Sequence, residues 1–262
     1  MKKDEEICRA IEAAEREAAA LMLGAREVLA ENKSSRRDVV TAYDREVQAL
    51  LMQRLRERVA DARFFCEEQE RQDELQAERL FIIDPIDGTM NFVHGFHHSC
   101  LSVACASGGE VRAAAVYNPY VDEMFTAVRG EGAFLNGRPI RVSEAPLRES
   151  VACFGTAPYN AELAGETFSL ARRVFEKSLD LRREGSAALD LCSVAAGRAG
   201  LYFELRVSLW DYAAGLLLVE EAGGRCCRID GAALGLSGER GSILAGGRTA
   251  VADFLRLTEA AR

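Results

Sequence analysis

The 262-residue sequence lacks several features that mark particular classes of protein. Its eight cysteines include no C-x-x-C pair, which disfavours a cysteine-based metal or redox motif. Some of them, such as Cys100 and Cys105, lie in apolar runs, where a free thiol behaves as a small hydrophobe. The sequence therefore predicts reduced core cysteines in a cytoplasmic protein.

Basic residues are in short supply, with 33 Lys and Arg against 41 Asp and Glu and a net charge of −8. Nucleic-acid binding relies on clustered Lys and Arg, so general nucleic-acid binding is not expected. No apolar run reaches membrane-spanning length, because Leu216–Val219 is flanked by Gly215 and Glu220. Residues 1–6 are too charged to lead into a signal peptide, and a membrane partner is not expected either.

Histidine is scarce as well, and this limits the chemistry available. Ser186 and Cys66 have no histidine within local reach, so the chain offers no good catalytic triad. His94, His97 and His98 form an H-x-x-H-H cluster. It could be interpreted as a zinc site, although three histidines on one short segment lack the separated ligands of a usual one.

The most informative stretch that is present runs from residue 80 to 92, L-F-I-I-D-P-I-D-G-T-M-N-F. Residues 80–83 predict a buried strand, and Pro85, which has no N–H, is expected to end its hydrogen-bonding ladder. The carboxylates of Asp84 and Asp87 follow and offer hard oxygen ligands for a divalent cation.

Gly88 and Thr89 lead into residues 90–96, which could begin a helix with unpaired N–H groups at its start. Such N–H groups hold anions, so one short loop offers ligands for both a cation and a phosphate. An ordinary turn is the alternative interpretation, because Asp, Pro and Gly dominate turns for local reasons.

The first half of the chain predicts helices followed by an antiparallel meander. Apolar spacing indicates a helix over residues 4–31, a polar break at 32–38 and a second helix that starts near Asp44, where this residue would serve as N-cap. Alternating patterns then predict short strands, with a tight turn at Gly108-Gly109: residues 64–68, 99–107, 110–118, 123–128 and part of 130–137.

The second half alternates between strands and helices. Strands are expected at residues 151–154, 180–183, 201–204, 226–229 and 243–245, and helices at 162–179, 186–198, 210–222 and 251–261. The fold class is therefore α+β, with helices packed on two sheets. We expect one structural unit with a soft boundary between residues 1–143, which carry the metal loop and the meander, and residues 144–262.

Four separated stretches now point to one site. They are Lys33-Ser34-Ser35…Asp38-Val39-Val40-Thr41…Asp44, Cys66-Glu67-Glu68, the D-P-I-D-G-T-M-N-F run, and Trp210-Asp211-Tyr212-Ala213-Ala214-Gly215. In this order they resemble the inositol monophosphatase family of Mg²⁺-dependent, Li⁺-sensitive phosphatases, over most of the chain. The resemblance implies a layered αβαβα sandwich, the fold shared with fructose-1,6-bisphosphatase.

The resemblance also implies a metal site of two or three Mg²⁺ ions. Glu67, Asp84 and the carbonyl of Ile86 would hold the first metal, and Asp84, Asp87 and Asp211 the second. Metal ions in such a pair activate a water and stabilise the phosphoryl and leaving-group oxygens.

Further roles follow from the same resemblance. Thr89 would orient the attacking water and Asp44 would accept its proton. Glu67 would contribute to catalysis by holding the first metal. The N–H groups of Gly88 and Thr89 would hold phosphate oxygens, and Glu68 would support the metal ligands without binding metal itself.

Substrate hydroxyl contacts are implied for Asp87, Ser186, Ala187 (through its backbone), Glu204 and Asp211. Buried acceptors of this kind discriminate because an analogue without the hydroxyl leaves them unpaired. Cys66, Met90, Glu184 and residues 206–209 depart from the family's usual residues beside the pocket mouth, which leaves the identity of the substrate open.

The implied function is hydrolysis of myo-inositol monophosphate, or of a similar small polyol phosphate, by a metal-activated water. Fructose-1,6-bisphosphatase, nucleotide 3′-phosphatase and histidinol-phosphatase activities of the same fold are the alternatives. A hypothesis of another class is a binding protein that partners transcription, as some bacterial relatives do. A homodimer is expected from the family alone.

Overall fold

The computed structural model describes residues 2–26, 28–35 and 38–259; for residues 32–35 and 38–39 it describes the backbone only. None of the helices in these ranges is long and apolar enough to cross a membrane. The helices are α1 (Lys2–Leu23), α2 (Ala42–Arg58), α3 (Thr89–Val93), α4 (Ala164–Phe175), α5 (Ala187–Ala195), α6 (Leu209–Glu221) and α7 (Arg248–Glu259).

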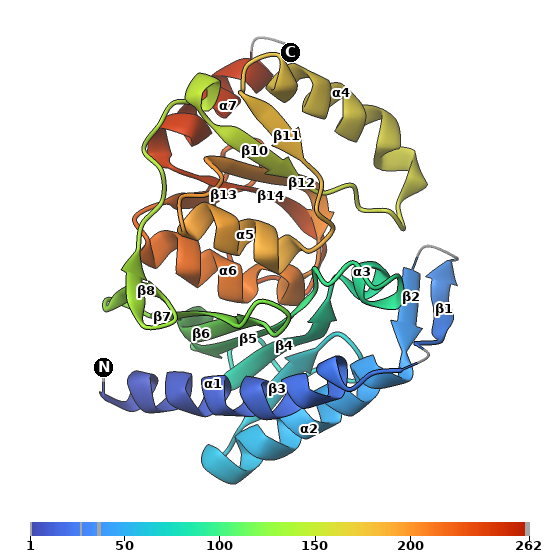
Figure 1. Cartoon of the computed structure of the whole chain (residues 1–262). Coiled ribbons are helices and arrows are strands. Elements are labelled where there is room, and N and C mark those ends of the chain that lie inside the picture. Colours follow the sequence, from blue (N-terminus) through green and yellow to red (C-terminus); the bar gives the residue numbers. More distant parts are fainter. Residues whose placement is uncertain (1, 27, 36–37, 260–262) are drawn as a thin grey trace.

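Helices and sheets alternate in layers, which confirms the predicted αβαβα sandwich (Figure 1). Helices α1 and α2 cover one face of the first sheet, and α5 and α6 lie between that sheet and the second one. Helices α4 and α7 cover the outer face of the second sheet.

The first sheet has seven strands in the order β3-β4-β5-β6-β7-β8-β9, and all its neighbours pair antiparallel except β3 and β4. The predicted meander is confirmed, and Gly108 and Gly109 turn between β5 and β6 with positive φ. The strands are β3 (Arg63–Cys66), β4 (Leu80–Asp87), β5 (Cys100–Ser107), β6 (Glu110–Asn118), β7 (Glu123–Val128), β8 (Gly132–Leu135) and β9 (Arg138–Ile140).

The second sheet has five strands in the order β11-β10-β12-β14-β13. Strand β10 is parallel to both of its neighbours, whereas β14 is antiparallel to β12 and β13. The strands are β10 (Val151–Phe154), β11 (Asp180–Arg182), β12 (Leu201–Val207), β13 (Arg225–Cys227) and β14 (Gly241–Gly246). The change of sheet falls between Ile140 and Val151; the domain boundary near residue 144 stays a prediction.

The central helix pair brings the two halves of the chain together. Leu191 and Val194 of α5 and Leu217 and Val219 of α6 are all completely buried between the sheets. A Cβ on Gly215 of α6 would lie 2.5 Å from the Leu191 Cβ, so glycine permits the close approach of the two helices. This contact holds the N-termini of α5 and α6, where polar residues lie, beside the carboxyl end of β4.

The N-terminal region differs from the prediction. Helix α1 ends at Leu23 rather than near residue 31, and the Gly24 N–H closes its last turn onto the Ala20 carbonyl. The predicted polar break instead contains an antiparallel hairpin of β1 (Ala30–Ser35) and β2 (Asp38–Thr41). The apolar spacing continues past residue 23, but the chain there leaves the helix and enters the β1–β2 hairpin. Local spacing is a weak indicator of a helix and did not decide the structure here. The side chains of Lys33, Ser34, Ser35 and Asp38 lie outside the described residues.

Two further predictions near the key loop were wrong. Strand β4 does not end at Pro85 but runs to Asp87, with a register shift between the Asp84–Ser102 and Asp87–Cys100 pairs. A proline is compatible with a strand where the ladder is interrupted in this way. The helix predicted over residues 90–96 is shorter and earlier, as α3 begins at Thr89 and ends at Val93.

All eight cysteines are free, as predicted, and all but Cys226 are buried.

Candidate active site

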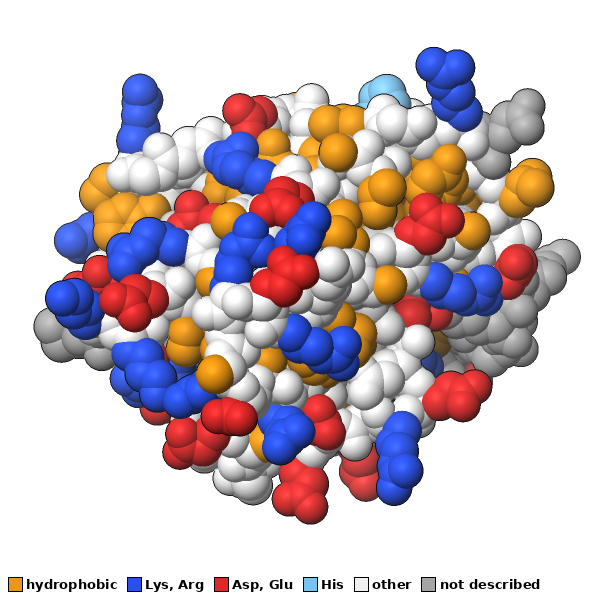
Figure 2. Space-filling model, turned by 90° about the horizontal axis from the view of Figure 1, so that it is seen from below, with side chains coloured by type: hydrophobic (Ala, Val, Ile, Leu, Met, Phe, Trp, Pro, Cys, Tyr) orange, Lys and Arg blue, Asp and Glu red, His pale blue; other side chains and the backbone are white. Residues whose placement is uncertain are grey.

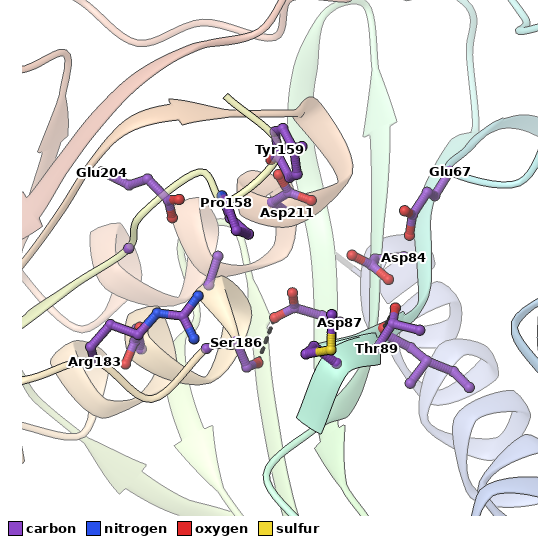
Figure 3. Close-up of a pocket in the computed structure, with 17 residues that line it drawn as sticks. Glu67, Asp84, Asp87, Thr89, Pro158, Tyr159, Arg183, Ser186, Glu204 and Asp211 are labelled. Atoms are coloured by element: carbon purple, nitrogen blue, oxygen red, sulfur yellow. Dashed lines mark hydrogen bonds between the residues drawn. The ribbon is translucent and has the colours of Figure 1, made fainter. Parts of the chain in front are cut away.

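A cavity of about 150 Å³ lies where the end of β4, the start of α3 and the N-termini of α5 and α6 meet the segment that follows β10 (Figure 3). Its lining is strongly acidic: Arg183 is the only cationic side chain among the described residues that line it. The six lining acids come from five different elements or loops: Glu67, Asp84, Asp87, Asp190, Glu204 and Asp211.

The register shift in β4 explains how two of these acids reach the cavity. Between the paired positions Asp84 and Asp87, Pro85 and Ile86 lie opposite the single residue Leu101 of β5, so β4 has one extra residue and bulges there. Both aspartates line the cavity, and the Ile86 carbonyl accepts a hydrogen bond from Thr89 Oγ1 at 3.1 Å.

Asp84 is a buried acid whose hydrogen bonding is incomplete. It is 2% exposed, and its buried Oδ1 has no hydrogen-bond partner. Burial, and after it the charges of Glu67, Asp87 and Asp211, raise the pKa of Asp84 well above its usual range. An unpartnered carboxyl oxygen among like charges is costly, and a bound cation would relieve both the missing partner and the repulsion.

The donor set fits a hard divalent cation. Figure 3 shows Glu67, Asp84, Asp87 and Asp211 arranged around the same cavity. Within the described ranges no three His, Cys, Asp or Glu side chains already form a compact metal cluster. Carboxylate oxygens are hard donors of the kind that Mg²⁺ prefers, and Mg²⁺ needs few protein ligands because it keeps several waters.

Asp87 joins the metal loop to the predicted substrate segment. Its Oδ2 accepts hydrogen bonds from Ser186 Oγ at 2.5 Å and from the Ala188 N–H at 2.7 Å. Burial raises the pKa of Asp87 to about 6, and these two donors oppose the rise. Ser186 also caps α5 by accepting from the Leu189 N–H at 3.3 Å, so its hydroxyl serves the protein as well as the cavity.

Gly88 has a φ of +86° and sits against backbone. An added Cβ would lie 3.1 Å from the His98 carbonyl oxygen and 3.2 Å from that of Gly185. Only glycine accepts both the left-handed conformation and the close packing, and it turns the chain from β4 into α3.

Asp44 and Thr89 are in contact, as the resemblance implies, because Thr89 Oγ1 lies 3.2 Å from Asp44 Oδ1. Asp44 is fully buried, and its Oδ2 accepts from the Thr41 N–H at 2.8 Å and the Thr41 hydroxyl at 2.6 Å. The prediction of Asp44 as N-cap was wrong. Thr41 is the N-cap of α2, and Asp44 is the N3 residue whose side chain completes the capping box. One carboxyl oxygen is thereby fixed by the helix start while the other meets Thr89.

Asp211 has a similar placement at the start of α6. Its Oδ2 accepts from the Ser208 N–H at 2.6 Å. Burial, followed by the charge of Asp87, raises the pKa of Asp211 well above its usual range. A helix start thus fixes one oxygen of each of two site aspartates, Asp44 and Asp211.

The remaining predicted residues divide between the cavity and its surroundings. Glu67, Ala187 and Glu204 line the cavity, whereas Glu68 is not a lining residue, and its N–H donates to Gln48 Oε1 at 3.0 Å. The histidine cluster does not converge: His97 stacks on Tyr120, and His98 Nε2 lies 3.1 Å from a Glu184 carboxyl oxygen. The zinc interpretation therefore has no support in the described structure.

Sequence reasoning missed five lining residues, namely Gly155, Pro158, Tyr159, Arg183 and Asp190. Asp190 is 1% exposed and its Oδ1 has no hydrogen-bond partner. An acid at a buried position of the predicted helix 186–198 was a signal that could have been used. The segment after β10 gives no such signal, because Gly-Thr-Ala-Pro-Tyr-Asn is typical of any turn.

Comparison with protein families identifies the class. The family model described as "Inositol monophosphatase family" matches residues 2–260, and the chain belongs to this family.

Curated relatives carry more than one name. An inositol-1-monophosphatase of Rhizobium meliloti is 40% identical over 210 residues, covering 80% of this chain and 78% of that protein. A Nus factor SuhB of Xylella fastidiosa is 38% identical over 201 residues, covering 76% and 72%. A fructose-1,6-bisphosphatase/inositol-1-monophosphatase of Thermotoga maritima is 40% identical over 195 residues, covering 74% and 73%. The chain is thus a phosphatase-family protein whose substrate these names leave open.

Solved structures give the same fold. The crystal structure of suhB from Bartonella henselae has a TM-score of 0.89 and 32% identity, covering 96% of this chain and 97% of that one. An IMPase/NADP phosphatase complexed with Mg²⁺ and phosphate has a TM-score of 0.84 and 25% identity, covering 99% and 95%. A staphylococcal inositol monophosphatase-1 in a LiCl-soaked inhibitory complex has the same TM-score, identity and coverage.

Proposed function

We propose that this protein is a Mg²⁺-dependent phosphomonoesterase that hydrolyses myo-inositol monophosphate or a similar small polyol phosphate. The observation that carries the proposal is the buried, unpartnered Oδ1 of Asp84, which faces the charges of Glu67, Asp87 and Asp211. Membership of the inositol monophosphatase family, and a family structure with Mg²⁺ and phosphate, support it.

The metal ligands we propose are Glu67, Asp84, the Ile86 carbonyl, Asp87 and Asp211. Bound Mg²⁺ would supply an acidified water and charge stabilisation at the phosphoryl and leaving oxygens. Helix starts and the Ser186 and Ala188 donors hold Asp87 and Asp211 through one oxygen each, so these carboxylates are already oriented before any ligand binds.

Thr89 and Asp44 form the proposed proton relay for the attacking water, with Asp44 as the final proton acceptor. The Thr89 hydroxyl has one proton and two acceptors in reach, Asp44 Oδ1 at 3.2 Å and the Ile86 carbonyl at 3.1 Å. When it donates to Asp44, its oxygen lone pairs can accept a hydrogen bond from a water. That water loses its proton through Thr89 to Asp44, whose other oxygen is already held by two Thr41 donors.

The N–H groups of Gly88 and Thr89 at the start of α3 are the proposed phosphate contacts. Asp87, Ser186, Ala187, Glu204 and Asp211 form the proposed hydroxyl-binding side of the cavity, and Glu68 supports Glu67 from outside it. We also expect, from the family alone, inhibition by Li⁺ and a homodimer.

The test is phosphate release from a panel of phosphate esters: myo-inositol 1-phosphate, glycerol 2-phosphate, fructose 1,6-bisphosphate, a nucleoside 3′-phosphate and histidinol phosphate. We expect the highest kcat/KM for the cyclitol or polyol monoesters, a requirement for Mg²⁺, and loss of activity with EDTA or Li⁺. Phosphate release that needs no metal and ignores Li⁺ would contradict the proposal.

A second candidate, partner binding in transcription, is supported by the relatives named Nus factor SuhB. It predicts that an Asp87→Asn protein, inactive as an enzyme, still complements loss of the gene in cells. Failure of this variant to complement, while the wild type does, would leave catalysis as the required activity.

A further inference from the structure

The segment after β10 contributes a tyrosine that no predicted role accounts for. Tyr159 lines the cavity, and Figure 3 draws it beside Asp211. Its hydroxyl makes no hydrogen bond within the described part of the chain. A phenol is protonated at neutral pH, so this hydroxyl can donate a hydrogen bond.

The guanidinium group of Arg240 packs over the ring of Tyr159 and holds it in place. Its guanidinium carbon lies 4.6 Å from the centre of the Tyr159 ring, within the range of a cation–π contact. Its Nε donates to Ser208 Oγ at 3.1 Å, immediately before the helix that carries Asp211. The tyrosine and Asp211 are therefore tied to the same structural support.

Glu204 fixes the backbone that leads to the tyrosine. Its Oε1 accepts from the Ala157 N–H at 2.7 Å and its Oε2 from the Tyr202 hydroxyl at 2.6 Å. Ala157 has a φ of +39°, a conformation that L-residues rarely adopt and that needs such support. A Cβ on Gly155 would lie 1.8 Å from Glu204 Oε2, so the segment runs directly over this carboxylate.

Each oxygen of Glu204 thus already accepts one hydrogen bond from the protein, whereas the nearby Tyr159 hydroxyl makes none within the described residues and has a proton to donate. We infer that Tyr159 is a substrate-binding residue that donates a hydrogen bond to a hydroxyl of the polyol, while Glu204 and Arg240 are positioning residues that hold it there. The inference rests on the proposed function, because it takes a polyol phosphate as the occupant of the cavity.

Tyr159→Phe tests the inference because it removes only the hydroxyl and keeps the ring under Arg240. The matched control is Tyr117→Phe, whose hydroxyl bonds Asp122 at 2.9 Å outside the cavity. Binding of myo-inositol 1-phosphate and of inorganic phosphate is measured by calorimetry with Ca²⁺ in place of Mg²⁺. Turnover of myo-inositol 1-phosphate and of para-nitrophenyl phosphate is measured separately with Mg²⁺.

We expect Tyr159→Phe to weaken binding of the inositol phosphate about 3- to 10-fold, the loss of one hydrogen bond, with inorganic phosphate bound as before. Its kcat/KM should fall by the same factor for the inositol phosphate and stay unchanged for para-nitrophenyl phosphate, which has no hydroxyl. Tyr117→Phe should match the wild type in every assay.

Arg240→Met should reproduce part of this loss, and adding it to Tyr159→Phe should cost little more, because the arginine acts through the tyrosine. Equal inositol phosphate binding by Tyr159→Phe and wild type would overturn the inference, and so would an equal loss with both substrates. A wild type that binds inositol phosphate but releases no phosphate would refute the proposed function and leave the tyrosine contact standing.

Discussion

The two sides of the cavity are built in different ways. The side that we propose to bind metal, called the metal side below, comes mainly from one continuous run, Asp84 to Thr89, shaped by a strand bulge and a glycine at positive φ. The side that we propose to bind the polyol, called the polyol side below, is assembled from separate parts of the chain: the segment after β10, the N-terminus of α5, and Glu204 on β12. The surface of the molecule seen from below in Figure 2, by contrast, mixes acidic and basic side chains without an obvious division.

The difference follows from what each side has to do. Holding a cation needs carboxylates crowded closer than their charges allow, and covalent spacing within one loop enforces that crowding. Recognising a polyol needs donors and acceptors spread over several ångströms, which only the packing of distant segments supplies. The two sides should therefore respond differently to substitution.

The largest effect is expected for Asp87→Asn, which removes a charge from the metal side. Loss of one proposed ligand should lower kcat/KM by about 10³-fold or more on every substrate, polyol or not. The fold should persist, since the amide oxygen can still accept from Ser186, and the melting temperature in EDTA should not fall. Activity within tenfold of wild type would remove Asp87 from the metal site.

A smaller and selective effect is expected for Gly155→Ala on the polyol side. The added Cβ, 1.8 Å from Glu204 Oε2, must displace the segment that carries Tyr159. A misplacement of this kind should lower kcat/KM for inositol phosphate by about 10²-fold or less. Para-nitrophenyl phosphate should be affected less. Gly165→Ala in α4, where a Cβ meets nothing within 4 Å, is the matched control and should be neutral.

Both Mg²⁺ and pH should change the melting temperature of the protein, because both act on the carboxyl groups of the metal side. The pKa of Asp87 is raised to about 6, and those of Asp84 and Asp211 are raised further above their usual range. Groups with a raised folded-state pKa stabilise the fold at low pH, and this contribution is lost as the pH rises through that pKa. In EDTA the melting temperature should therefore fall between pH 5 and pH 8.

Added Mg²⁺ should oppose this fall, and more strongly at pH 8, because the ligands must be deprotonated. Differential scanning calorimetry with EDTA or Mg²⁺ across this pH range gives the comparison. Asp84→Asn should flatten the curve in EDTA. A melting temperature in EDTA that rises toward pH 8 would show that the site carboxyls do not repel one another.

The smallest effect is expected at an acid that belongs to neither side. Glu15 on α1 is fully buried, both its carboxyl oxygens lack partners, and burial raises its pKa well above the usual range. Glu15→Met should stabilise the protein by about 1–3 kcal/mol at pH 8, with phosphatase activity unchanged. The exposed Glu46→Met is the control, and equal melting temperatures for the two variants would count against an uncompensated buried acid.

The sequence was most informative where spacing within one segment carries the chemistry. The D-P-I-D-G-T run and the W-D-Y-A-A-G run, with the Glu pair between β3 and the following loop, led to the family and to residues that the structure brings around one cavity. The layered fold was predicted as well, because two-residue and helical periodicities were clear over the meander and over the long helices.

Predictions failed where tertiary contacts override local preference. The passage of β4 through Pro85 depends on pairing with β5, which lies elsewhere in the chain. The β1–β2 hairpin and the Thr41–Asp44 capping box are local, and their short sequence signals were not used. Tyr159 and Arg183 gave no recognisable spacing, so the sequence could not place them in the cavity, whereas Asp190 offered the unused signal of an acid on a buried helix face.

The sequence by itself determined the family, the layered architecture and the acids proposed to hold metal, since short-range order along the chain is enough to specify a loop of carboxylates. Only the tertiary structure decided how the proposed polyol side is arranged: each oxygen of Glu204 accepts one hydrogen bond, from Ala157 or from Tyr202, while the Tyr159 hydroxyl has a proton to donate. The physical reason is that the hydrogen bonds that orient Glu204, and the position of Tyr159 beside it, arise only when segments distant in the sequence pack together.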